Sequence, residues 1–219
     1  MESTFVSLFN ILAELFYEYT DNSLCDTCKE FHSRKYFNFN SSHSLKFYHD
    51  EDFRITVQSR IDTRNKLSIN LKWSNIADVR PLNNIHKLDI SYCPVVDVSS
   101  LNNIHTLIAS CCKFGDVSSL RDCNSLTLNW CENVEDVSML KNVSHLILDH
   151  CHKVTNVNPL GCVPYLSLLN CHGVRDISGL GNNHTLILSR CHNIFDFRSV
   201  YNIHTLHIDW IKTDKSLFK

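Results

Sequence analysis

The stretch that decides the fold is LILDHCHKVTNVNPL, residues Leu146–Leu160, one copy of a unit that recurs through the last two-thirds of the chain. The unit has the form L-x-L-x-x-C-(x)-x-V-x-D-V-x-x-L, and its first apolar residue returns every 19 residues at first and every 20 residues later. A fixed period of this length predicts a stack of coils in which each coil is one repeat. The first apolar residues of the eight units are Ile69, Leu88, Leu107, Leu126, Leu146, Leu166, Leu186 and Leu206.

Each unit predicts a short strand followed by a turn. Leu146 and Leu148 are two residues apart, so their side chains point to the same side of a strand. The aspartate or asparagine of the unit, here Asn156, suits a turn because its side chain accepts hydrogen bonds from the backbone N–H groups that follow. A coil of 19 or 20 residues has no room for a long return helix, so we expect 3-10 turns or extended segments there. The expected core residues of the quoted copy are Leu146, Leu148, Cys151, Val154, Val157 and Leu160.

Six of the eleven cysteines lie at one position of the repeat, five residues after its first apolar residue. We expect their thiols to point inward as a row of buried, unpaired side chains. Side chains that project in parallel do not readily reach the S–S torsion, so a reducing compartment is favoured over disulfides. A straight row is also not a tetrahedral ligand set, so no metal site is expected. This cysteine row consists of Cys93, Cys112, Cys131, Cys151, Cys171 and Cys191.

Charge and composition argue against several classes of function. The formal net charge of −2 gives no basic field for a phosphate backbone, so nucleic acid is not an expected partner. No apolar run approaches the roughly 18 residues that span a bilayer, and no basic residue precedes the apolar N-terminal stretch. We therefore expect a cytoplasmic or nuclear protein that does not enter a membrane.

The sequence contains no motif that predicts catalysis or a cofactor. The five glycines form no phosphate-binding loop, and no serine or pair of carboxylates stands in a catalytic context. We expect a protein that is not an enzyme, with no catalytic, cofactor-binding or metal-binding residues. A metal or thiol enzyme that uses the repeated cysteines and histidines is a distant alternative.

The pattern L-x-x-I/V-x-x-L-x-L-x-x-C, which Leu101–Cys112 follows, resembles the leucine-rich repeat family and its cysteine-containing subclass. The resemblance covers residues 69–219. It implies an α/β repeat solenoid with short parallel β-strands on a concave face and 3-10 or extended segments on the convex side. It also implies that a protein target binds on the concave face.

Residues 1–36 differ from the repeats and predict a small helical module, with apolar residues at helical spacing over about 5–19. The string from Ile11 to Phe31 resembles the middle of an F-box, although the usual Leu-Pro pair is replaced by Phe9-Asn10. The resemblance implies docking onto a Skp-type adaptor of a cullin-based ubiquitin ligase. The alternative is a helical cap on the first repeat. The implied adaptor-binding residues are Ile11, Leu12, Leu15, Phe16 and Leu24.

Residues 37–68 are expected to be one or two degenerate entry repeats. His43-x-Leu45-x-Phe47 imitates the entry into a repeat strand, and Phe53–Val57 alternates like a half-buried strand. Terminal repeats are commonly atypical because one of their faces has no neighbouring coil.

The candidates for target contact lie between and just beyond the strand anchors. Five of them share one position, four residues after the first apolar residue, and tryptophan, tyrosine and arginine are the types that dominate binding hot spots. Large residues that merely cover the edge of the sheet are the alternative. The target-binding candidates are Tyr92, Trp130, Asp149, His150, Arg190 and Trp210.

We therefore expect an F-box-type substrate-recognition subunit in which the repeats bind the target. The runner-up is a scaffold in which only the repeats bind partners.

Overall fold

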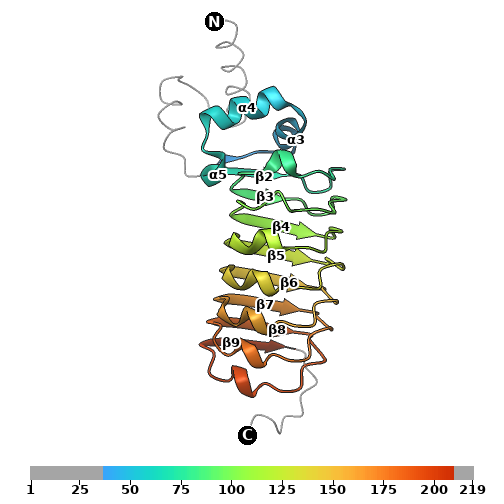
Figure 1. Ribbon diagram of the computed structural model, residues 1–219, viewed down its shortest axis with the longest axis vertical. Coiled ribbons are helices and arrows are strands. Elements are labelled where there is room, and N and C mark those ends of the chain that lie inside the picture. Colours follow the sequence, from blue (N-terminus) through green and yellow to red (C-terminus); the bar gives the residue numbers. More distant parts are fainter. Residues whose placement is uncertain (1–36, 210–219) are drawn as a thin grey trace, which may run out of the picture.

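The computed structural model describes residues 37–209 as a stack of coils whose strands form a single parallel sheet (Figure 1). The order of the strands follows the chain, and Leu146 pairs with Leu126 on one side and with Leu166 on the other. This register confirms the repeat unit. The strands are β1 (Phe37–Asn38), β2 (Leu67–Asn70), β3 (Lys87–Asp89), β4 (Thr106–Ser110), β5 (Ser125–Asn129), β6 (His145–Asp149), β7 (Tyr165–Leu169), β8 (Thr185–Ser189) and β9 (Thr205–Asp209).

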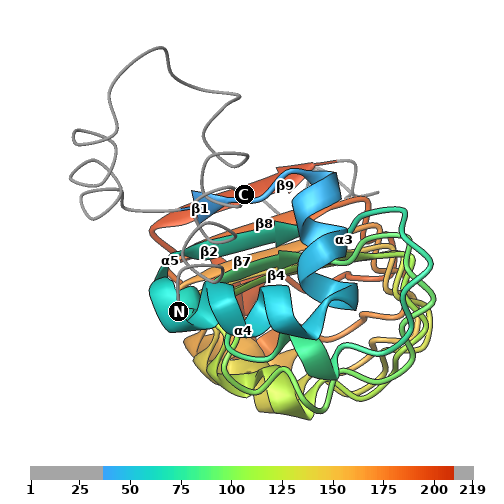
Figure 2. The ribbon, with the colours of Figure 1, turned by 90° about the horizontal axis from the view of Figure 1, so that it is seen from above.

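Short 3-10 helices form the return side of the coils, away from the sheet (Figure 2). The turn that precedes each of them is closed by the predicted acidic or amide side chain. The backbone N–H of Ser138 donates to Oδ1 of Asp136 at 2.8 Å, which lowers the pKa of that carboxyl group, and Asn158 donates to Asn156 at 3.2 Å. The 3-10 helices are η1 (Arg80–Leu82), η2 (Ser118–Asp122), η3 (Ser138–Asn142), η4 (Asn158–Cys162), η5 (Ser178–Leu180) and η6 (Arg198–Val200).

The core is one continuous apolar column between the sheet and the return side. Each coil contributes the same positions, and the six core residues expected in the quoted copy are all fully buried. A coil can bury these side chains only against its neighbours, so the stack is stabilised by contacts between successive coils. The parallel sheet and the shared core confirm the sequence-based prediction of a leucine-rich-repeat solenoid.

Residues 41–66 are largely helical, which corrects two expectations from the sequence. The residues His43–Phe47 lie in helix α3 (Ser41–His49), and Phe53–Val57 lie in helix α4 (Glu51–Arg60), so neither segment is a strand. The alternation of apolar residues was misleading because the buried positions are four apart. Phe53 and Val57 are buried on one face of α4, whereas Ile55 between them is 56% exposed.

A single residue, Asp50, joins the two helices and caps both of them. Its backbone N–H donates to the carbonyl oxygen of Lys46 at 2.8 Å, and its side chain accepts from the N–H of Phe53 at 2.9 Å. The guanidinium of Arg54 also donates to the carbonyl oxygen of Phe47 at 3.0 Å. These bonds fix the angle between α3 and α4, which lie with α5 (Thr63–Lys66) over the β2 end of the stack (Figure 1).

The F-box-like segment, residues 1–36, lies outside the described residues, and so does the target-binding candidate Trp210. The five adaptor-binding candidates therefore have no structural description, and their role stays a prediction. Within residues 37–209, no helix is both long and apolar enough to cross a membrane.

Candidate functional site

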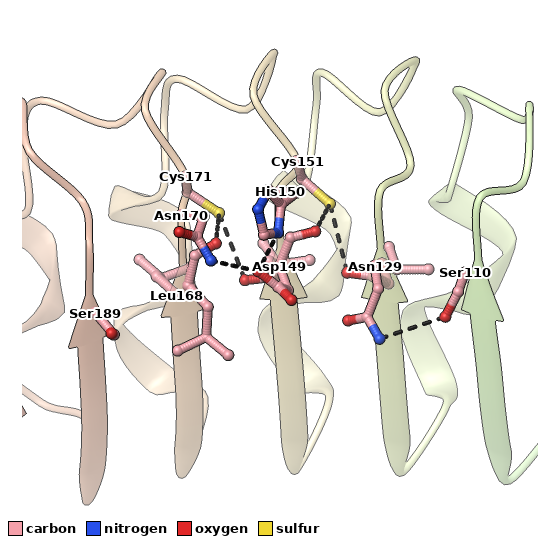
Figure 3. A network of polar contacts seen from close by, with 12 residues as sticks. Ser110, Asn129, Asp149, His150, Cys151, Leu168, Asn170, Cys171 and Ser189 are labelled. Carbon is pink, nitrogen blue, oxygen red and sulfur yellow. Dashed lines mark hydrogen bonds and ion pairs between the residues drawn. The ribbon is translucent and has the colours of Figure 1, made fainter.

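The thiols of the cysteine row point into the stack, as the sequence predicts. Sγ of Cys151 lies 3.5 Å from the carbonyl oxygen of Leu128 in the preceding coil and 3.6 Å from that of Asp149 (Figure 3). Sγ of Cys171 lies 3.5 Å from the carbonyl oxygen of Leu148, one coil further along. Each thiol can thus donate to the backbone of the coil before it, and the cysteine row links adjacent coils.

Burial disfavours ionisation of these thiols at neutral pH. It raises the pKa of Cys112 and Cys131 to about 12 and that of Cys151 to about 11. Thiolate, the form that attacks electrophiles and binds metals, is therefore scarce. Among the residues that the structure describes, no three histidine, cysteine or acidic side chains are grouped so as to hold a metal ion.

The candidate site begins where each strand ends, at a residue with left-handed backbone conformation. Seven residues, each four positions after the first apolar residue of its unit, have φ between 51° and 67°. This conformation costs an L-residue about 1–2 kcal/mol, and glycine adopts it most easily, yet none of the seven is glycine. We call these residues the rim row: Trp73, Tyr92, Cys111, Trp130, His150, Asn170 and Arg190.

Four aromatic side chains of the rim row form two separate stacks, each between adjacent coils. The rings of Trp73 and Tyr92 stack at 3.7 Å between centroids, and Nζ of Lys72 lies 5.5 Å from the centroid of Tyr92. The rings of Trp130 and His150 form a second stack at 3.7 Å. Trp73 remains 68% exposed and Trp130 45% exposed, so both stacks present aromatic surface to solvent.

Polar side chains from successive strands are hydrogen-bonded beside the rim row (Figure 3). Nδ2 of Asn129 donates to Oγ of Ser110 at 3.3 Å, and Nδ2 of Asn170 donates to Oδ1 of Asp149 at 3.0 Å. The same Oδ1 lies 2.6 Å from Nδ1 of His150. Asp149 therefore contacts a rim residue of its own coil and is hydrogen-bonded to one from the next coil.

The extra residue of the 20-residue units lies in the turn just after the rim row. It stands between the cysteine and the following valine or isoleucine, as a comparison of Cys112-Lys113-Phe114 with Cys131-Glu132-Asn133-Val134 shows. In the shorter turn, the N–H of Lys113 donates to the carbonyl oxygen of Val95 in the preceding coil at 2.9 Å. In the longer turn, the N–H of Val134 donates to Cys131 of the same coil at 3.2 Å, so the turn closes on itself.

Of the target-binding candidates, Tyr92, Trp130, His150 and Arg190 belong to the rim row, and Asp149 contacts it. The structure brings these five together along one edge of the sheet. Sequence reasoning missed Trp73, Cys111 and Asn170 as members of the row. The repeat position alone could have found them, because each lies four residues after the first apolar residue of its unit.

Comparison with known proteins identifies the fold but no close relative. No family model matches the chain, and no curated protein matches it. The solved structure of internalin C2 from Listeria monocytogenes is similar at 22% identity and a TM-score of 0.51, over 68% of this chain and 72% of that one. Internalin F from the same organism has 19% identity and a TM-score of 0.49 over 70% of this chain, which spans about half (52%) of the internalin F chain. With nine parallel strands in one open sheet and a repeat that pairs in register, the chain has the leucine-rich-repeat solenoid fold.

Proposed function

We propose that the chain is a non-enzymatic scaffold that binds a protein target along the rim row and the adjoining face of the sheet. The observation that carries this proposal is the type of residue found at the left-handed positions of the rim row. A chain adapted only for stability would use glycine or asparagine there, whereas this one places tryptophan, tyrosine, histidine or arginine at five of the seven positions. Backbone strain held at such positions, with aromatic and cationic side chains exposed, is typical of a binding surface.

Site-specific photocrosslinking can test this proposal. A photoreactive phenylalanine analogue replaces Tyr92 or Trp130 in two proteins, and in a matched control it replaces Phe195, a 68% exposed side chain between β8 and η6. All three proteins are irradiated in the same cell extract. We expect a discrete adduct from positions 92 and 130 that is absent from position 195. Equal adduct patterns from all three positions would contradict the proposal.

A second candidate function rests on the sequence of residues 1–36. The F-box resemblance over Ile11–Phe31 supports a role in which this segment recruits a Skp-type adaptor while the coils hold the target close to the site of ubiquitin transfer. Such a protein works by proximity and performs no bond chemistry itself. It would act in the cytoplasm or nucleus, in keeping with its nine described cysteines, all of which are free.

A pull-down with a purified Skp-type adaptor tests this second function. We expect the adaptor to bind the intact chain and to be lost with Leu15→Asp. The matched control is Ile55→Asp, an exposed position of α4 that carries no adaptor candidate. If the intact chain retains no adaptor, the F-box role is wrong and the scaffold proposal stands alone.

A further inference from the structure

Four histidines, one of them the rim residue His150, form a continuous patch at the turns that follow β6, β7 and β8. The rings of His152 and His172 stack at 5.1 Å and 6°, and those of His172 and His192 stack at 5.5 Å and 15°. The ring of His150 lies edge-on to that of His152 at 5.7 Å and stacks on Trp130. We call His150, His152, His172 and His192 the histidine patch.

Three of the four histidines share one position of the repeat, in longer turns. His152, His172 and His192 directly follow the cysteines of three successive 20-residue units, and all three side chains are exposed. In the shorter units the same position holds Pro94 and Lys113. The imidazole rings therefore repeat at the spacing of the strands, about 4.8 Å, and face the same way.

The charges around the patch leave room for an anion. Oδ1 of Asp149 lies 2.6 Å from Nδ1 of His150. Glu135 is already paired with Lys153 at 3.2 Å. Arg190 lies beside the patch in the rim row. Glu132 precedes the patch by one coil, because it directly follows Cys131 as His152 directly follows Cys151.

Protonation therefore places several like charges in one line. The pKa of His172 is lowered, first by burial and then by repulsion from His152, His192 and His150. A bound carboxylate would offset this repulsion and favour the charged rings. Binding of an anion and uptake of protons are then thermodynamically linked, so each strengthens the other.

We propose that the histidine patch binds a short acidic segment of a protein partner and takes up protons as it does so, which makes binding tighter in mildly acidic solution. This inference rests on the proposed scaffold function and names the chemistry of part of its partner. From His152 to His192 the patch spans two strand spacings, about 10 Å, which matches about three residues of an extended chain. A long polyanion such as nucleic acid fits less well, because the aspartates of the following turns, among them Asp136 and Asp176, would repel it.

The probe is a fluorescein-labelled peptide of about ten glutamates. The full chain is titrated into it, and fluorescence anisotropy measures the affinity. Linkage predicts a tenfold change in affinity per pH unit for each proton taken up, so we expect binding at least about tenfold tighter at about pH 5.5 than at about pH 7.5. A peptide of glutamines should show no such change. Single-stranded DNA of similar length tests for unspecific binding of polyanions.

Two matched triple variants locate the effect. His152→Gln/His172→Gln/His192→Gln should lose the pH dependence, and His105→Gln/His184→Gln/His204→Gln should keep it. The control histidines lie where the chain enters the strands and also stack, with 4.4 Å between the rings of His184 and His204. Circular dichroism at about pH 7.5 checks folding, and the single variant His152→Gln replaces the triple variant if the latter is misfolded.

Three results would overturn the inference: an affinity that does not change with pH, equal losses in the two triple variants, or DNA binding as tight as that of the glutamate peptide. Failure of the scaffold proposal is a separate outcome. It is read from the photocrosslinks at positions 92 and 130, which lie outside the three substituted histidines.

Discussion

The 19-residue and the 20-residue coils share one interior but differ in the turn that follows the strand. Both classes bury the same leucine and cysteine positions, and both carry a left-handed rim residue. In the coil of β4 the shorter turn is bonded to the preceding coil through the N–H of Lys113, whereas the longer turns close on themselves, as Val134 does on Cys131. The comparison teaches that one added residue left the buried positions unchanged and lengthened a surface turn, and three of the four longer turns carry the histidines of the patch.

The largest expected effect concerns the reactivity of the thiols that both classes of coil bury. The exposed Cys111 and Cys162 should react with a thiol reagent at once, whereas Cys131 and Cys151 should react at least about a hundredfold more slowly because burial suppresses their thiolate form. Mass spectrometry after brief labelling of the native protein measures this difference. Labelling in denaturant is the control, in which all sites should react. Rapid labelling of Cys131 in the native state would contradict the shared interior.

Core truncation should test whether the two classes of coil are equally well packed. Leu107→Ala in a shorter coil and Leu166→Ala in a longer coil should each lower the free energy of unfolding by about 2–5 kcal/mol, since both side chains are fully buried. Leu206→Ala, at a partly buried position of β9, should cost clearly less. Urea unfolding at one pH measures all three. A small effect at Leu166 alone would mean that the longer coils pack more loosely.

The extra residue itself should make a smaller contribution. Nδ2 of Asn133 donates to the carbonyl oxygen of Lys113 at 2.7 Å, and Nδ2 of Asn193 donates to that of His172 at 2.6 Å. Asn133→Ala and Asn193→Ala should each reduce stability by about 0.5–1.5 kcal/mol. Lys153→Ala is the matched control, because Lys153 occupies the same position and has only a surface ion pair with Glu135. Equal effects at all three positions would show that the amide bonds contribute nothing specific.

The smallest expected effect is the dependence of stability on pH that His172 contributes in a longer coil. The pKa of His172 is lower in the folded chain than in the unfolded chain, so protonation favours unfolding. The associated stability is present above the unfolded-state pKa of about 6.5 and is lost as the pH falls below it. His172→Gln should therefore be less destabilised than the parent protein between about pH 7.5 and about pH 5. Denaturation midpoints at both pH values measure this, with His207→Gln, at an exposed position of β9, as the control that should behave like the parent.

Much of the fold could be predicted because the repeat encodes it directly. The spacing from Leu126 to Leu146 to Leu166 predicted the register, and the position of Cys151 relative to Leu146 predicted an inward thiol. The helices α3 and α4 could not be predicted in this way. Residues 41–60 occur once in the chain, so a short apolar run such as Phe53–Val57 had no second copy to show whether its period was two or four.

The candidate site was only partly predictable, for a different reason. Repeat position was enough to mark Tyr92, Trp130 and Arg190 as outward-facing residues. The left-handed backbone of the rim row was not predictable, because sequence reasoning expects glycine or asparagine where φ is positive, and Trp130 is neither. The stacking of His152 on His172 depends on how the longer turn places its side chains, which the spacing alone does not determine.

The cysteine row also constrains how the chain can reach its native state. Six thiols that end as parallel, separated side chains are all accessible in the unfolded chain, together with five further cysteines. Any disulfide formed among the six before the coils stack would have to break again, because the stacked geometry does not suit the bond. Refolding yield should therefore depend on reductant during assembly, and the finished solenoid should no longer need it.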